Sequence, residues 1–314
     1  MKKPIKIVTA VLCILAMAVF AACTTSPDTT EATATPSANV PAYDRDGFPF
    51  TMPTSTNTIV SIGPSNTEIL VGLGFADAII QTDMFSAGIP GIASDIATLD
   101  MMALDMERII SLNPCVVFVA GLARVYGEME PLAVVSDVGI SVVYIPTSTS
   151  IAEIKEDILF ISAVMGRHSQ GEAIVADMTE EINFFRQLGE SVTQRRTVYF
   201  EISPAPFMFS FGTGTFLHEM IELVGATNIF GDQYSWLGVA DEVLLDLNPD
   251  IIFTTTDFID DPVGEIKSRS GWDSITAVQN GDVFQVNADA SQRPSQNIVI
   301  ALREIAAAVH PDEF

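Results

Sequence analysis

The sequence predicts an α/β protein built from two related lobes with a helical segment between them. Three observations support this prediction. Short apolar runs alternate with helical patterns from Thr58 onward, helical spacing is continuous near the middle of the chain, and one motif recurs in both halves. Such alternation is typical of βαβ units, whose strands form parallel sheets. A chain of 314 residues is long enough for two lobes that each bury a core.

The first 22 residues have the pattern of an export signal. Lys2 and Lys3 precede an apolar run from Ile7 to Ala22, and small residues stand immediately before Cys23. A basic segment, an apolar segment and small residues in this order predict a secretory signal peptide over residues 1–22. The alternative is an uncleaved membrane anchor, although the run falls just below the usual spanning length of roughly 17–25 residues.

The cysteine at the end of this signal resembles the lipobox cysteine of bacterial lipoproteins, apart from Phe20 where Leu is more usual. The resemblance implies that Cys23 is lipidated. The protein is then extracytoplasmic and held to the cell membrane by its N-terminal lipid only. Residues 23–39 are dominated by Thr, Ser, Ala and Pro, a composition that cannot bury enough surface to fold. We expect this segment to be a flexible tether.

The N-terminal lobe is expected over residues 40–149. It opens with a small hairpin over Val40–Met52, whose turn is Asp46-Gly47. Its strands are predicted from short apolar runs at Ile59–Ile62, Ala78–Thr82, Val116–Ala120 and Val142–Ile145. Cys115 stands beside the third run with no polarising partner near it in sequence, so we expect a core residue rather than a reactive thiol.

Residues 150–190 are expected to form an interdomain helical segment. Apolar residues recur at helical spacing from Ile151 to Gly189, with a break only around Gly166–Gly171. This is too long for an ordinary connection. The C-terminal lobe is then expected over residues 191–314, with strands at Thr197–Ile202, Ile251–Thr255 and Val283–Val286.

The two lobes also resemble each other in sequence. Glu107 is followed by Leu-Asn-Pro and a strand that ends at Phe118, and Glu242 is followed by Leu-Asn-Pro and a strand that ends at Phe253. One offset of 135 residues relates both pairs (107 to 242 and 118 to 253). A constant offset with the same helix–proline–strand context indicates an internal duplication.

Composition narrows the possible functions. With 15 Lys+Arg against 40 Asp+Glu the net charge is −25, which excludes nucleic acid and anionic lipid surfaces as partners. None of His168, His218 and His310 follows a predicted strand, so a receptor for free zinc or manganese ions is not expected. The chain has no Gly-x-Ser-x-Gly elbow, Walker loop or strand-linked glycine fingerprint, and no enzymatic activity is expected.

An exported lipoprotein with two α/β lobes joined by helix resembles the class III periplasmic binding proteins, which deliver ferric siderophores, haem and cobalamin to ABC importers. The resemblance runs from about Val40 to Phe314. Its motifs are Ile59–Leu70, the unit from Glu107 to Phe118, its repeat at Glu242, and Thr215-Phe216-Leu217 with Gly225–Phe230. It implies two Rossmann-like lobes with mainly parallel sheets, joined by a long interdomain helix.

The resemblance also implies partners and residue roles. The expected partners are an ABC permease dimer with its ATPase subunits and a small-molecule chelate. The protein itself is expected to be a monomer without an intrinsic cofactor. In this family one exposed glutamate on each lobe meets arginines of the permease, and the matching positions here are Glu107 and Glu242. The alternative is that both are solvated charges on a helix face.

Ligand contacts are expected at the carboxyl ends of the strands, where open α/β sheets bind their ligands. The candidates follow a predicted strand or are aromatic or basic side chains near one: Ser65, Asn66, Phe85, Phe207, Tyr234, Trp236, Phe258 and Arg293. Trp236 fits a small separate core equally well, and Arg293 fits a salt bridge. Asp83, Asp257 and Asp289 favour a cationic or hydroxyl-rich ligand, whereas Arg293 favours an anionic one, so the ligand stays open.

The expected function is therefore a lipid-anchored receptor that captures an iron chelate of the ferric siderophore type. A cobalamin or other corrinoid receptor, or a haem receptor, is the alternative within the same family. The alternatives of another class are an exported hydrolase and a surface-interaction protein that transports nothing.

Overall fold

The computed structural model describes residues 41–121 and 132–313. The expected signal peptide over 1–22, the lipidated Cys23 and the tether over 23–39 lie outside the described residues.

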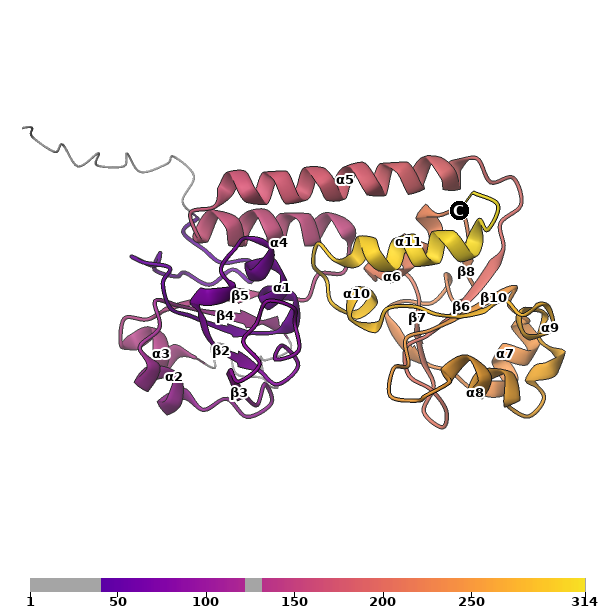
Figure 1. The fold of residues 1–314 in the computed structure, drawn as a ribbon, viewed down its shortest axis with the longest axis horizontal. Coiled ribbons are helices and arrows are strands. Elements are labelled where there is room, and N and C mark those ends of the chain that lie inside the picture. The colour runs from indigo at the N-terminus through magenta and orange to yellow at the C-terminus, as the bar shows by residue number, and fades with distance from the viewer. Residues whose placement is uncertain (1–40, 122–131, 314) are drawn as a thin grey trace, which may run out of the picture. The chain divides into compact units, whose positions relative to one another are not determined.

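The first sheet has five parallel strands in the order β3-β2-β1-β4-β5 (Figure 1). They are β1 (Ile59–Ile62), β2 (Ile79–Asp83), β3 (Ala97–Leu99), β4 (Val116–Ala120) and β5 (Ser141–Ile145). Four of them match the predicted strands to within one residue at each end. The edge strand β3 was not predicted, because its first two residues are exposed and it therefore has no apolar run.

The second sheet is parallel too, in the order β11-β10-β6-β8. Its strands are β6 (Thr197–Glu201), β8 (Thr227–Asn228), β10 (Ile251–Thr254) and β11 (Val283–Gln285). The order matches β5-β4-β1-β2 of the first sheet strand by strand, which supports the duplication inferred from sequence. A separate antiparallel ribbon pairs β7 (Phe209–Phe211) with β9 (Trp236–Gly238).

Helices cover both faces of each sheet (Figure 1). In chain order they are α1 (Pro64–Gly72), α2 (Met106–Leu112), α3 (Ala133–Asp137), α4 (Ile151–Val164), α5 (His168–Glu190), α6 (Phe216–Leu223), α7 (Asp241–Leu247), α8 (Pro262–Ser268), α9 (Thr276–Asn280), α10 (Ala288–Gln292) and α11 (Ile298–Val309). The α/β class with parallel sheets is thus confirmed.

Side-chain alternation along the strands divides the core into layers. In β4, Val117 and Val119 pack with Ile109 of α2, whereas Val116 and Phe118 face the cluster that contains α1 and α4. The second sheet repeats this arrangement, with α7, α8 and α9 on one face and α5, α6 and α11 on the other. The cluster shared by α4, α5, α6 and α11 is continuous, so one apolar core joins the two halves.

The expected interdomain segment consists of two helices, α4 and α5, that lie against each other (Figure 1). The chain turns between them at Gly166, whose φ is +65°. The break is shorter than predicted, because Gly171 already lies inside α5. A Cβ at this position would fall 2.1 Å from the Ser162 Oγ atom of α4. Gly171 therefore allows close helix packing and does not mark a loop.

The repeated Leu-Asn-Pro motif is a helix stop. Asn113 ends α2 with φ +46° and Asn248 ends α7 with φ +48°, the left-handed conformation that asparagine tolerates better than most residues. The Asn248 Oδ1 atom also accepts a hydrogen bond from the Thr276 amide at 2.7 Å. The following proline then directs the chain into β4 or β10.

Two local expectations have different outcomes. The hairpin expected over Val40–Met52 is present as a turn with one antiparallel bridge between Tyr43 and Pro49. The core assignment of Cys115 is wrong, because this residue precedes β4 and is only partly buried. The Thr58 hydroxyl lies 3.2 Å from its sulfur atom and lowers the pKa of the thiol.

Candidate functional site

A cavity of about 910 Å³ lies at the carboxyl ends of strands from both sheets. Residues that follow β1, β2 and β5, together with the end of β4, form one wall. Residues that follow β6, β10 and β11 form the opposite wall. This is the position at which open α/β sheets bind ligands. A volume of this size accommodates a large organic molecule, because ordinary ligand pockets measure about 300–1,000 Å³.

Most of the lining is apolar. The apolar residues are Pro64, Phe85, Met101, Met102, Ala120, Gly121, Pro146, Ile202, Phe258, Ala288 and Pro294. The polar ones are Ser65, Thr147, Thr255, Thr256 and Gln292, and the charged ones are Asp257, Asp289 and Arg293. An apolar surface with a few polar groups favours a bulky ligand that is bound by shape and by a small number of hydrogen bonds.

Four of the eight predicted ligand contacts line this cavity: Ser65, Phe85, Phe258 and Arg293. Phe85 and Phe258 come from opposite walls, and their side chains are 58% and 75% exposed. Two aromatic rings that are this exposed in a cavity are available to pack on a flat ligand.

The other four predicted contacts are not among the residues that line the cavity. Asn66 is fully buried in α1, where its Nδ2 atom donates to the Ile62 carbonyl at 3.3 Å. Tyr234 and Trp236 belong to the ribbon region, and the Trp236 ring packs at 6.0 Å from the buried Phe211 ring. Phe207 is 79% exposed. Trp236 is 47% exposed, and it belongs neither to the lining residues nor to the three buried hydrophobic clusters.

Sequence reasoning missed several lining residues. Met101 and Met102 follow the unpredicted strand β3. Thr255 and Thr256 follow β10 directly, and the rule that ligands bind at the carboxyl ends of strands would have found them.

Arg293 lies at the cavity wall and is anchored on both sides. Its Nη1 atom is 3.0 Å from the Glu68 Oε1 atom, and its Nη2 atom is 2.6 Å from the Asp289 Oδ1 atom. The Nη2 atom also donates to the Phe85 carbonyl at 3.2 Å. Arg293 was expected to be either a ligand contact or a member of a salt bridge. In the structure it lines the cavity and is also paired with two carboxylates.

Asp83 does not contribute charge to the cavity surface. It is fully buried, and its carboxylate accepts hydrogen bonds from the amides of Gly63 and Phe85, both at 2.8 Å, and from the Ser86 hydroxyl. The residue instead orders the loops that follow β1 and β2. Asp257 and Asp289, which were expected to contribute negative charge together with Asp83, do line the cavity.

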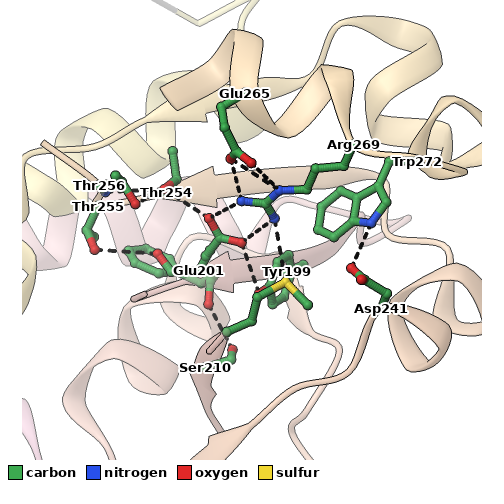
Figure 2. A network of polar contacts seen from close by, with 12 residues as sticks. Tyr199, Glu201, Ser210, Asp241, Thr254, Thr255, Thr256, Glu265, Arg269 and Trp272 are labelled. Carbon is green, nitrogen blue, oxygen red and sulfur yellow. Dashed lines mark hydrogen bonds and ion pairs between the residues drawn. The ribbon is translucent and has the colours of Figure 1, made fainter. Parts of the chain in front are cut away.

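A buried polar network supports the opposite wall (Figure 2). The Glu201 carboxylate at the end of β6 is fully buried. It accepts hydrogen bonds from both terminal nitrogens of Arg269, at 2.6 and 3.0 Å. Arg269 also pairs with Glu265 and lies 4.5 Å from the centre of the Trp272 ring, whose Nε1 atom donates to Asp241. The network runs from the first turn of α7 to the strand ends at the cavity.

The glycine between β1 and α1 is required by two constraints. Gly63 has φ +118°, and a Cβ at this position would lie 2.3 Å from the Ala120 Cβ atom. We expect Gly63→Ala to lower the free energy of unfolding by about 2–3 kcal/mol through this overlap and the strained backbone. Gly74→Ala is the control. Gly74 has φ +85°, but a Cβ at this position would meet nothing within 4 Å. Its replacement should lower the free energy of unfolding by about 1 kcal/mol. Urea unfolding measures both, and equal losses would contradict the steric explanation.

The two predicted docking residues occupy matching places. Glu107 lies in the first turn of α2 and Glu242 in the first turn of α7, and both are exposed. Each helix packs on its own sheet through a buried residue of the next turn, Ile109 or Leu244. The duplication therefore presents one carboxylate at the same position of each half.

The described residues contain neither a candidate metal cluster nor a candidate membrane-spanning helix. Residues 41–121 and 132–313 contain no group of three or more His, Cys, Asp or Glu side chains placed to hold a metal ion. Within the same ranges, no helix combines the length and the apolar character needed to cross a membrane.

Comparison with known proteins agrees with this architecture. A family model described as "Periplasmic binding protein" matches residues 59–290. An uncharacterised ABC transporter substrate-binding lipoprotein of Bacillus subtilis is 28% identical over 258 residues, which are 82% of this chain and 81% of the relative. A cobalamin-binding protein of Halobacterium salinarum is 24% identical over 282 residues, 84% of this chain and 74% of the relative.

Among solved structures, a possible iron-binding periplasmic solute-binding protein from Staphylococcus epidermidis superposes with a TM-score of 0.70 at 27% identity. The match covers 81% of this chain and 98% of that one. The similarity thus extends over both sheets and the helices between them.

Proposed function

Because the chain belongs to the periplasmic binding protein family, we propose that it captures an iron chelate of the ferric siderophore type and delivers it to the permease of an ABC importer. Members of this family are extracytoplasmic solute-binding proteins that work with permease and ATPase subunits, and they are not enzymes. We also propose that the protein is a monomer and that a lipid on Cys23 anchors it to the membrane.

The observation that supports a chelate is the cavity. It is large and mostly apolar, with aromatic rings from both walls and hydroxyl groups on Ser65 and Thr147. A free metal ion needs a compact set of ligands. A large complex needs area and scattered hydrogen bonds, and the cavity provides both. Because a chelator already occupies the coordination sites of its metal ion, the protein needs no metal ligand of its own.

A corrinoid is the second candidate, since the relative from Halobacterium salinarum is named cobalamin-binding. Haem is a weaker candidate. The described lining contains no His, Tyr or Cys, and Met101 and Met102 are its only side chains of the kind that ligate haem iron.

The test is calorimetric titration of residues 24–314 with ferric citrate, ferric hydroxamate and catecholate siderophores, haem and cobalamin. We expect saturable submicromolar binding of one complex. Tryptophan fluorescence is a poor reporter, because Trp236 and Trp272 are not among the lining residues.

Two variants connect the binding to the cavity. Phe85→Ala and Phe258→Ala should each weaken binding about 10–100-fold, since each removes one aromatic wall. Phe184→Ala is the control, because Phe184 is 59% exposed on α5 and does not line the cavity. If no complex binds, the proposal is wrong and a surface-interaction role without transport replaces it. If Phe184→Ala weakens binding as much as the other two, the ligand does not occupy this cavity.

A further inference from the structure

The charges of the cavity are unbalanced. Among its described lining residues, Asp257 and Asp289 are acidic and Arg293 is the single basic residue. Asp257 is exposed and Asp289 has 60% of its side chain exposed, so both carboxylates face water or ligand. If Arg293 were free, its guanidinium would attract an anionic ligand.

Arg293 is not free, because Glu68 neutralises it from behind the wall. Glu68 lies in α1, its side chain is 4% exposed, and it is not a lining residue. Its Oε1 atom accepts from Arg293 at 3.0 Å, and its Oε2 atom accepts from Asn297 at 2.9 Å and from the Ser295 hydroxyl. Arg293, Ser295 and Asn297 thus all donate to this carboxylate.

The Nη2 atom of Arg293 has partners as well. The Nη2 atom is shared between the Asp289 carboxylate at 2.6 Å and the Phe85 carbonyl at 3.2 Å. An anionic ligand must therefore displace Asp289 or meet an arginine whose charge is already compensated. Asp257 and the electrostatic field of a chain with a net charge of −25 also repel such a ligand.

We propose that Glu68 and Asp289, by neutralising Arg293, make this cavity selective for neutral or cationic complexes and discriminate against anionic ones. Asp289 acts at the cavity surface, and Glu68 is a positioning residue that acts through Arg293. The inference rests on the proposed function. It divides the candidate ligands by charge, since a ferric tris-hydroxamate is neutral whereas a ferric tris-catecholate is a multiply charged anion.

A purely structural role for Glu68 makes a different prediction. Besides Arg293, the residue holds Ser295, Asn297 and, through its carbonyl oxygen, the Gln296 side chain at 2.8 Å. If it only ordered this segment, its loss would weaken all ligands alike. If it sets the charge of the cavity, its loss must strengthen anionic ligands relative to neutral ones.

The experiment compares two synthetic ferric complexes built on one tripodal backbone, a neutral tris-hydroxamate and an anionic tris-catecholate. Their affinities are measured by calorimetry for the wild-type protein, Asp289→Asn, Glu68→Gln and Arg293→Gln. Asp289→Asn is the safe variant for folding because it changes an exposed group. Asp177→Asn, on the exposed face of α5, is the matched control for net charge.

The wild type should bind the neutral complex more tightly. Asp289→Asn and Glu68→Gln should each raise the ratio of anionic to neutral affinity by about tenfold, equivalent to about 1.4 kcal/mol. Arg293→Gln should lower this ratio, and Asp177→Asn should leave it unchanged. Added salt should reduce the discrimination, because the charges act partly through water.

Tighter binding of the anionic complex by the wild type would overturn the inference and leave the proposed function standing. Equal changes for both complexes in Asp289→Asn and Glu68→Gln would also overturn it, in favour of the structural role. If the wild type binds neither complex nor any chelate of the larger panel, the proposed function itself fails and the inference fails with it.

Discussion

Replacing Arg269 with Met is expected to lower the free energy of unfolding by about 3–5 kcal/mol, the usual cost of leaving a buried charge unpaired. Glu201 is fully buried, and the two terminal nitrogens of Arg269 are 2.6 and 3.0 Å from its oxygens (Figure 2). The substitution keeps the apolar stem and removes these bonds together with the stacking on Trp272. Urea unfolding at neutral pH measures the loss.

The control is Arg303→Met. Arg303 is 2.7 Å from Glu181, but the two side chains are 54% and 39% exposed, so the pair should contribute no more than about 1 kcal/mol. Comparable losses in both variants would contradict the assignment of Arg269 as the partner of a buried charge.

The loss in Arg269→Met should also depend on pH. Burial raises the pKa of Glu201 above its ordinary value of 4.5, and Arg269 opposes this shift. Because the folded state then holds the proton more firmly than the unfolded state, stability falls as pH rises from 4.5 through the folded-state pKa. Without Arg269 the pKa rises further, so the variant should lose less stability near pH 4.5 than at neutral pH.

The double variant Glu201→Gln/Arg269→Met tests this explanation, since it removes the titrating group. The pH dependence that distinguishes Arg269→Met from the wild type should disappear in the double variant. If it persists, a titrating group other than Glu201 is responsible for the difference.

Replacing Glu107 and Glu242 together by Ala is expected to abolish stimulation of the permease ATPase while chelate affinity stays at its wild-type value. Both glutamates are exposed on short helices, and neither is among the residues that line the cavity. Two carboxylates in equivalent positions of duplicated halves are suited to orient the protein on a dimeric, two-fold partner. ATPase activity of the reconstituted transporter and calorimetric affinity are the two measurements.

The matched control is Glu180→Ala/Glu190→Ala, which removes two exposed carboxylates of α5 and the same net charge. This variant should stimulate the permease normally. ATPase stimulation that survives the first double change, or that is lost equally in the control, would show that Glu107 and Glu242 have no specific docking role.

The fold was predictable to a large extent because its signals are local. The central strands are continuous apolar runs, since parallel strands covered on both faces have no polar side to show. The Leu-Asn-Pro repeat marked both helix stops, because asparagine in a left-handed conformation followed by proline ends a helix wherever it occurs. The short strands β3 and β9 were missed, since they are three residues long and partly exposed.

The candidate site was predictable only in outline. Strand ends identified Ser65, Phe85, Phe258 and Arg293, all of which line the cavity. Aromatic composition alone did not lead to the cavity, because Tyr234 and Trp236 are exposed residues of the ribbon region that are not among its lining residues.

The positions of the central strands, the helix stops and the internal duplication are written in short stretches of this chain, because they depend on backbone conformation and on runs of neighbouring apolar side chains. The pairing of Glu68 with Arg293 is different, since 225 residues separate the two. Only the folded chain brings them to 3.0 Å, and only there does the single arginine of the described cavity lining lose its attraction for anions. The charge of a binding site depends on which distant groups share its low-dielectric wall, and the order of residues does not reveal that.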